Sequence, residues 1–345
     1  MKNVLIIGSG KRVQEAALPA FFRTEEHFRV RGIYARTEKE ITVEERSLQV
    51  ERLLDLEQRT VDEADLIYMV VGKNAVPAVL ATLCKLNVSN ADLLIDTPVL
   101  RFKHLGHLGL LDAFRNTWVP EDCTTLPVYD VIEAFFETGA IGDLKRVLFD
   151  RSAYAYHGIA MGRRLFSAGR VRSAKQSKRG NGELLRTIRF ERDGELAIVS
   201  PRDYGCGHVT LEGTRGSVSD DPRSAAGHRL TALLDGQACT GFAIDSLKIE
   251  LTAAERSLMG SPKPASSPEP GIWIWMEGMK RVGFLRLLKN IADGKGAYPL
   301  AHAVEDTVVD YHLEKIRCYI SNPFTSAHFA SARFLMKLLT RLAGK

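Results

Sequence analysis

The chain has 345 residues and a mass of 38.3 kDa, which is long for a single core, so we expect two domains. Apolar residues make up 45% of it, and 47 lysines and arginines nearly balance 42 aspartates and glutamates. This composition excludes a largely disordered protein. The net charge of +5 comes without a long basic block, which favours a small phosphate-bearing ligand over nucleic acid.

The cysteines are scattered and odd in number: Cys84, Cys123, Cys206, Cys239 and Cys318. None forms a C-x-x-C pair, so the spacing indicates neither a disulfide framework nor a zinc site, and we expect no metal. No apolar run reaches the roughly 18 residues of a membrane span, and no signal peptide is evident. We therefore expect a cytoplasmic protein with no membrane partner.

Residues 4–13, VLIIGSGKRV, predict a buried first strand that enters a phosphate-binding turn. Gly8 would permit the tight turn, and Gly10 would let a pyrophosphate approach bare backbone at a helix N-terminus. Val13 stands where a third glycine completes the dinucleotide fingerprint. Because G-x-G alone is a weak signal, a turn that binds nothing is the alternative interpretation.

A second strand, residues 30–34, runs into Tyr34-Ala35-Arg36-Thr37. A carboxylate at this point would hold the adenosine ribose of NAD. Arg36 and Thr37 suit a 2′-phosphate instead, which predicts NADP as the cofactor and NAD as the alternative. A solvated surface arginine is the competing interpretation of Arg36.

The first half continues with segments that alternate between helix and strand. We predict helices over 14–22, 44–58 and 76–86, and strands over 64–71 and 93–96. This order builds an open parallel sheet, whose ligands bind at the carboxyl ends of the strands. Residues 72–74 and 96–98 follow two of these strands and should line a cofactor crevice.

From about residue 122 the pattern changes to short period-two stretches separated by turns. The predicted helices lie at 128–137, 157–166, 279–292 and 303–320, and the predicted strands at 144–153, 184–190, 196–200, 209–212, 217–219, 230–234 and 247–251. Strands joined by short turns predict an antiparallel sheet. The fold class is thus an α/β Rossmann domain, residues 1–121, plus an α+β domain with a large, mostly antiparallel sheet, residues 122–325. We expect residues 326–345 to form an amphipathic helix.

These segments together resemble the Gfo/Idh/MocA family of NAD(P)-dependent oxidoreductases. The resemblance rests on Gly8-Ser9-Gly10, on the strand DLIYMVVGKN, on IDTPVL where the family has E-K-P, and on ETGAIGDLKRVLFD, AYHGIAMGRRLF, LEGTRGSVSD and YPLAHAVEDTVVDYHLEKI. It covers nearly the whole chain. It implies hydride transfer to or from a hydroxyl or keto carbon of a sugar or nucleotide sugar, as in the UDP-sugar 3-dehydrogenases, within a homodimer or homotetramer. The apolar stripe of the terminal helix adds surface to bury, so we expect Phe334 and Leu338 to be buried in that assembly.

Two departures from the family concern catalysis. Thr97 replaces the lysine of E-K-P, and Ala160 stands where the family's later motif has an aspartate, while His157 is kept. A threonine hydroxyl can orient an oxygen but is too weak an acid to exchange a proton near neutral pH. His157 is then the expected proton carrier, assisted by Thr97 and Tyr156.

The candidate cofactor-binding residues are Gly8, Ser9, Gly10, Lys11, Arg12, Arg36, Thr37, Gly72, Lys73, Asn74, Asp96 and Pro98. Two alternatives to the sugar oxidoreductase stay open. One is an inactive cofactor-binding sensor or partner subunit, which the replacement of the family's lysine and aspartate by Thr97 and Ala160 would explain. The other is a double-bond reductase similar to the biliverdin reductases, which would need less proton chemistry.

Overall fold

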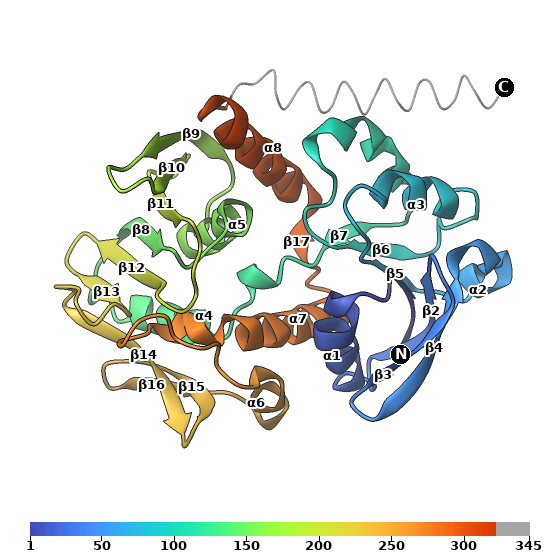
Figure 1. Ribbon diagram of the computed structural model, residues 1–345, viewed down its shortest axis with the longest axis horizontal. Coiled ribbons are helices and arrows are strands. Elements are labelled where there is room, and N and C mark those ends of the chain that lie inside the picture. Colours follow the sequence, from blue (N-terminus) through green and yellow to red (C-terminus); the bar gives the residue numbers. More distant parts are fainter. Residues whose placement is uncertain (322–345) are drawn as a thin grey trace. The chain divides into compact units, whose positions relative to one another are not determined.

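The computed structural model describes residues 1–321, which divide into two compact units (Figure 1). Unit 1 comprises residues 1–120 and 288–308 with Ser321, and unit 2 comprises residues 121–287 and 309–320. The expected helix at 326–345, with Phe334 and Leu338, lies outside the described residues. No helix within the described part of the chain is long and apolar enough to cross a membrane.

Unit 1 is built on an eight-stranded sheet in the order β17-β7-β6-β5-β1-β2-β4-β3. Its strands are β1 (Lys2–Ile7), β2 (Phe28–Ala35), β3 (Lys39–Val43), β4 (Arg46–Arg52), β5 (Leu66–Met69), β6 (Asp92–Ile95), β7 (Thr117–Val119) and β17 (Tyr298–Pro299). All neighbouring pairs are parallel except β3 with β4 and β17 with β7. The parallel, Rossmann-type half of the predicted fold is confirmed. Residues 4–7 are wholly buried at its centre, as expected of a strand covered on both faces.

The helices of unit 1 are short. They are the π-helical turn η1 (Val13–Ala17), which continues into α1 (Leu18–Phe22), then η2 (Leu53–Asp55), α2 (Gln58–Asp62), α3 (Val76–Leu83) and the 3-10 segment η3 (Phe102–Ala113). The predicted helices at 14–22 and 76–86 therefore correspond to η1 with α1 and to α3.

The helix predicted over residues 44–58 is wrong. Residues 39–52 form the antiparallel hairpin β3–β4, with Val43 opposite Arg46. Glu44 and Glu45 make its turn with φ of 48° and 67°. The apolar residues Ile41, Val43 and Val50 are buried while their neighbours are exposed, so the true period here is two.

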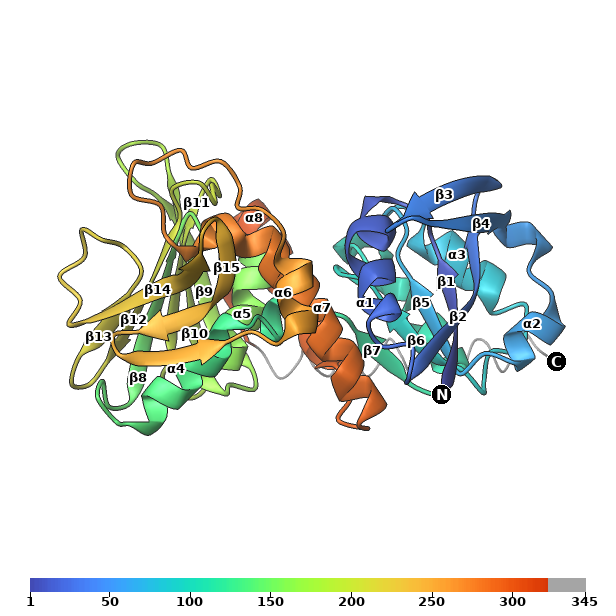
Figure 2. The same ribbon diagram turned by 90° about the horizontal axis from the view of Figure 1, so that it is seen from below.

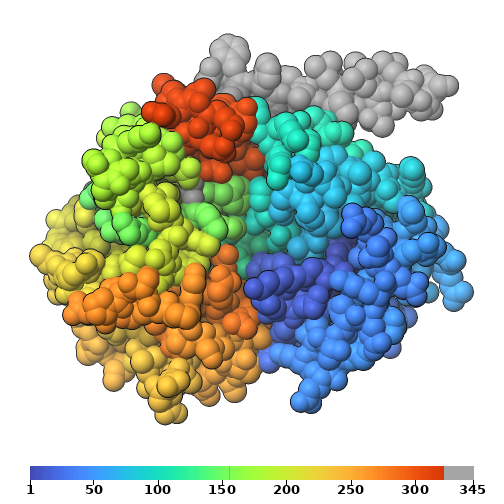
Figure 3. All heavy atoms as spheres, viewed as in Figure 1, coloured from blue at the N-terminus to red at the C-terminus, as the bar shows by residue number. Residues whose placement is uncertain are grey.

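Unit 2 is built on a ten-stranded sheet in the order β16-β15-β14-β13-β12-β8-β11-β10-β9-β18. Its strands are β8 (Leu144–Asp150), β9 (Val171–Lys178), β10 (Leu184–Phe190), β11 (Glu195–Ser200), β12 (His208–Gly213), β13 (Ser217–Ser219), β14 (His228–Asp235), β15 (Ala238–Ile244), β16 (Leu247–Glu250) and β18 (Cys318–Ile320). Only β8 with β11 and β13 with β14 pair in parallel among these described strands, so the predicted antiparallel sheet is confirmed. Figure 3 shows these green to yellow segments packed beside the orange residues that follow them in the chain.

The structure adds three strands to unit 2 that the sequence pattern did not indicate: β9, β15 and β18. The last replaces the end of the helix predicted over 303–320. Helix α8 (Leu300–Ile316) stops because Arg317 adopts a left-handed φ of 60°, and residues 318–320 then pair with β9.

Helix α5 (Ala155–Phe166) packs on one face of this sheet, against β8, β10 and β11 (Figure 2). Two glycines allow the close approach. A Cβ at Gly158 would lie 2.5 Å from Ile198 Cδ1, and one at Gly162 would lie 2.9 Å from Leu196 Cδ2. This contact fixes the position of the first turn of α5, which carries His157.

Arg286 on α7 (Met276–Ala292) ties together α4 (Val128–Glu137) and α6 (Ala253–Met259). Its guanidinium lies 2.8 Å from Asp130 and donates to Glu255 at 2.6 Å. Burial raises the pKa of Glu255, but the hydrogen bonds from Arg286 and Thr252 outweigh it, so this pKa lies below its ordinary value. A buried carboxylate is thus fully paired. The remaining short helices of unit 2 are η4 (Asp122–Thr124) and η5 (Ile272–Trp275).

Candidate functional site

The turn after β1 has the backbone geometry of a dinucleotide-binding turn. Gly8 donates its amide to Tyr34 O at 2.7 Å and has a φ of +126°, and a Cβ there would lie 2.0 Å from Val70 O. Helical backbone begins at Lys11. At Gly10, by contrast, a Cβ would meet nothing within 4 Å. Open backbone therefore faces outward where a helix begins, as pyrophosphate binding requires.

Three of the predicted cofactor residues gather beside this turn at the carboxyl edge of the sheet. Lys73 Nζ lies 3.0 Å from the carbonyl oxygen of Asp96 and 3.3 Å from its carboxylate. Arg12 Nε lies 3.7 Å from the other oxygen of the same carboxylate. Asp96 thus holds two cations next to the glycine turn.

The predicted 2′-phosphate residues Arg36 and Thr37 follow β2 and are exposed. The structure adds a cation that sequence reasoning did not select: Lys39 Nζ donates to Ser9 O at 3.4 Å. Lys39 reaches the glycine turn because residues 39–52 form a hairpin, and the helix predicted over 44–58 gave no reason to select it.

The remaining candidates of unit 1 lie in the two loops that follow β5 and β6. Gly72 and Asn74 are exposed, and a Cβ at Gly72 would meet nothing within 4 Å. Thr97 and Pro98 are half-buried and joined by a cis peptide bond.

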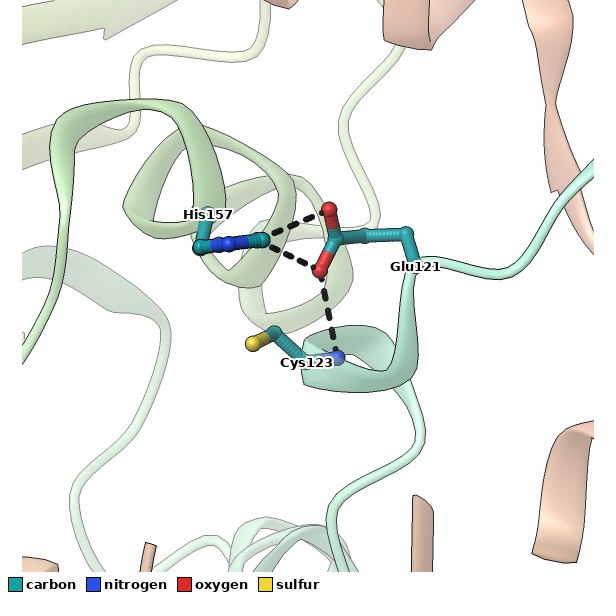
Figure 4. A group of neighbouring side chains, drawn as sticks. All are labelled: Glu121, Cys123 and His157. Atoms are coloured by element: carbon teal, nitrogen blue, oxygen red, sulfur yellow. Dashed lines mark hydrogen bonds and ion pairs between the residues drawn. The ribbon is translucent and has the colours of Figure 1, made fainter. Parts of the chain in front are cut away.

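In unit 2, His157 contacts a carboxylate that the sequence did not single out. Its Nδ1 lies 2.9 Å from both oxygens of Glu121, and Figure 4 shows the two side chains pointing toward one another. Glu121 is wholly buried at the N-terminus of η4, and the His157 side chain is 21% exposed. Because α5 packs against η4, residues 36 positions apart meet.

With Glu121 ionised, this contact determines which nitrogen of His157 carries the proton of the neutral ring. An ionised carboxylate only accepts hydrogen bonds, so Nδ1 must donate and Nε2 of the neutral ring keeps its lone pair. Nε2 is then free to take a proton, and the carboxylate stabilises the cation that results. This is the arrangement in which a carboxylate orients a histidine general base.

Cys123 completes the cluster. Its amide donates to Glu121 at 3.2 Å, and Tyr129 Oη donates to its carbonyl oxygen at 2.8 Å. The thiol is completely buried, and burial raises its pKa well above the ordinary value although the charge of Lys280 acts in the opposite direction. Asp310 also lies near enough to His157 for their charges to interact, and burial raises the pKa of this carboxyl group.

The three predicted catalytic residues fall in both units. Tyr156 and His157 are neighbours on α5, with ring centroids 5.4 Å apart at 85° and Tyr156 buried. Thr97 belongs to unit 1. Sequence reasoning missed Glu121 and Cys123, since a glutamate two residues before a cysteine is no recognised motif and lies far from position 157.

No protein-family model and no curated protein matches the chain in sequence. Solved structures match over nearly its whole length. An oxidoreductase from Thermotoga maritima is 12% identical, with 96% of this chain and 99% of that chain covered and a TM-score of 0.59. A scyllo-inositol dehydrogenase from Lactobacillus casei is 10% identical, with 93% and 98% covered and a TM-score of 0.56. GenD2 from gentamicin A biosynthesis, solved in complex with NAD, is 13% identical, with 93% and 96% covered and a TM-score of 0.56. At these identities the similarity establishes the shared fold.

Proposed function

We propose that this protein is an NAD(P)-dependent oxidoreductase that transfers hydride to or from a hydroxyl or keto carbon of a sugar. The fold is that of named oxidoreductases and dehydrogenases, one of them solved with NAD. The open backbone at Gly10 and the cations Lys11, Arg12 and Lys39 around the glycine turn suit a dinucleotide's phosphates.

One observation carries the catalytic part of the proposal: the bond between His157 Nδ1 and the buried carboxylate of Glu121. A protein that only binds cofactor has no need to bury a carboxylate behind a partly exposed histidine ring. This contact therefore favours an enzyme over the inactive sensor.

The residues of the chain divide the chemistry between them. The bound nicotinamide would supply the hydride acceptor or donor. As the substrate's carbinol carbon loses hydride, His157 Nε2 takes the hydroxyl proton, and Glu121 stabilises the imidazolium through Nδ1. In the direction of reduction His157 returns that proton to the oxygen. Thr97 can only hydrogen-bond, so the proposal assigns it no proton transfer.

The arginines in and near α5 bear on whether the substrate is a simple sugar or a nucleotide sugar. Arg151 pairs with Glu183, and Arg164 pairs with Glu133 at 2.5 Å. Each of these guanidinium groups already has a carboxylate partner within unit 2. These contacts support a simple sugar or cyclitol rather than a diphosphate-linked one.

Cofactor binding tests the proposal without any knowledge of the substrate. NADP or NAD should raise the melting temperature of the full-length protein as its concentration exceeds the dissociation constant. A side chain at position 10 would point into open space in the free protein but would block a pyrophosphate. Gly10→Val should thus weaken cofactor binding by about 10²-fold.

Gly106→Val is the matched control, because a Cβ at Gly106 in η3 also meets nothing within 4 Å. It should bind cofactor like the parent, as measured by isothermal titration calorimetry. If neither nucleotide binds the parent, or if both variants behave alike, the proposed cofactor site is wrong.

The choice between the two cofactors depends on Arg36. A charge-assisted hydrogen bond to the 2′-phosphate contributes about 1.5–3 kcal/mol, so Arg36→Asp should weaken NADP binding by roughly 10- to 100-fold and make NAD the preferred cofactor. Arg29→Asp is the control, since Arg29 is also exposed but lies near the start of β2. Equal affinity for the two nucleotides in the parent, unchanged by Arg36→Asp, would show that Arg36 is only a surface residue.

A further inference from the structure

Three different metal-binding groups converge where η4 meets α5. A carboxylate oxygen of Glu121, the thiol of Cys123 and a ring nitrogen of His157 all lie within 4.8 Å of one another, and Nδ1 of that ring lies 2.9 Å from Glu121. Figure 4 shows the thiol on the same side of the η4 turn as the contact between Glu121 and His157. The sequence gives no hint of this, because the cysteine and the histidine lie far apart and in no zinc-type spacing.

We propose that Glu121, Cys123 and His157 form a site for a divalent transition metal of the zinc class. Carboxylate oxygen, thiolate sulfur and imidazole nitrogen are the three donor types that zinc takes from proteins. The presence of sulfur and nitrogen excludes magnesium and calcium, which select oxygen ligands. Three protein ligands leave a fourth position for water or substrate, as in catalytic rather than structural zinc sites.

The geometry needs only small movements. Zinc bonds of about 2.0–2.1 Å to nitrogen and oxygen and about 2.3 Å to sulfur place tetrahedral ligands roughly 3.3–3.6 Å apart. The 2.9 Å separation between His157 Nδ1 and Glu121 must open by a few tenths of an ångström, and the thiol must move inward. Glu121 caps η4 and Cys123 lies within it, so the backbone holds these two residues in one turn and only their side chains need to adjust.

The electrostatics of the cluster also favour a cation. Glu121 is wholly buried, and its hydrogen-bond partners are the amide of Cys123 and the ring of His157. Buried carboxylates are normally paired with a cation or bound to a metal. Asp310 places a further carboxyl group near His157, whereas the charge of Lys280 opposes a cation and burial disfavours the thiolate of Cys123, so the attraction for a metal comes from the buried carboxylate of Glu121. On binding, the metal replaces the thiol proton, which is released to solvent.

The metal and the proposed base would compete for the same ring, a consequence that rests on the proposed function. With a metal on Nδ1, the neutral imidazole carries its proton on Nε2 and cannot accept another. Zinc should therefore inhibit hydride transfer by the metal-free enzyme.

Cobalt(II) provides a direct probe of binding that needs neither cofactor nor substrate. The full-length protein is first treated with a chelator and then titrated with Co²⁺. We expect a thiolate-to-cobalt charge-transfer band in the near ultraviolet that saturates at one equivalent and disappears when Zn²⁺ is added. Cys123→Ser should abolish the band. It should also weaken zinc binding by about 100-fold, because losing a residue that only supports a ligand already costs about 10- to 100-fold in affinity.

Cys239→Ser is the matched control. Cys239 is also a buried cysteine of unit 2, but its thiol donates to Gly241 O at 3.4 Å on β15 and takes no part in the cluster. It should keep the band. His157→Gln offers a second variant, and it should lower zinc stoichiometry in equilibrium dialysis while Cys123 is intact.

The metal site is refuted if the parent gives no charge-transfer band, or if the band survives Cys123→Ser. It is also refuted if Cys239→Ser removes the band to the same extent. Because the measurement contains no nucleotide, these outcomes are independent of whether the protein binds NADP or turns over a sugar.

Discussion

His157→Ala should lower the rate of single-turnover hydride transfer by about 10²- to 10⁴-fold, the usual contribution of a general acid or base. The affinity for NADP should hardly change, because the candidate phosphate-binding residues lie in unit 1 and His157 in unit 2. The loss should appear in kcat and kcat/KM alike, since the interaction is made only as the proton moves. Stopped-flow absorbance of the reduced nicotinamide, under single-turnover conditions, measures the rate directly.

The control for this variant is His107→Ala. His107 is an exposed histidine of η3 in unit 1, and its loss should leave the rate unchanged. Should His157→Ala transfer hydride within a few-fold of the parent, another group is the base and the Glu121–His157 pair serves only to hold η4 against α5. The folding of His157→Ala is checked by its melting temperature, because the variant leaves the buried carboxylate of Glu121 without its imidazole partner and should lose stability.

Gly8→Ala should destabilise the protein strongly, although it adds a single methyl group. That methyl would lie 2.0 Å from Val70 O, a backbone atom rather than a flexible side chain, and Val70 is held in place because its amide donates to Ile7 O at 2.8 Å. The φ of +126° is also one that only glycine adopts without strain. Strain and overlap together should lower the free energy of unfolding by about 2–6 kcal/mol.

Gly10→Ala is the comparison that separates the two glycines. Its added methyl meets nothing within 4 Å and φ there is not positive, so its stability should stay within about 0.5 kcal/mol of the parent. Urea unfolding followed by circular dichroism measures both variants. Equal unfolding midpoints for Gly8→Ala and the parent would mean that the turn rearranges freely, which is inconsistent with a rigid first strand and turn.

The sequence by itself determined the strands at the centre of the parallel sheet and the turn that follows the first of them. Residues 4–7 and 66–69 are continuous apolar runs, and such runs are buried on both faces in any parallel sheet. Gly8 is likewise predictable from sequence, since few other residues permit its backbone φ of +126°. The period-two stretches of the second half gave its antiparallel sheet for the same local reason.

The local sequence did not predict the β3–β4 hairpin, because its many charged residues hid the alternation of buried and exposed side chains. Residues 44–58 carry so many acidic and basic side chains that their pattern predicts a solvated helix, yet residues 39–52 form a hairpin in which Ile41, Val43 and Val50 are buried. The tertiary contact with β2 decides this, because a strand at the end of a sheet gains its hydrogen bonds from a neighbour that the local sequence does not specify.

The candidate site shows the same division. The sequence could nominate Lys73 and Asp96 because each follows a recognisable strand, and it could nominate His157 through the resemblance to the oxidoreductase family. Only the tertiary structure could join Glu121 and Cys123 to His157, since the packing of α5 on η4 brings them together and no local rule encodes a contact between residues so far apart in the chain. A histidine's tautomer, and the metal its neighbours could bind, depend on that contact.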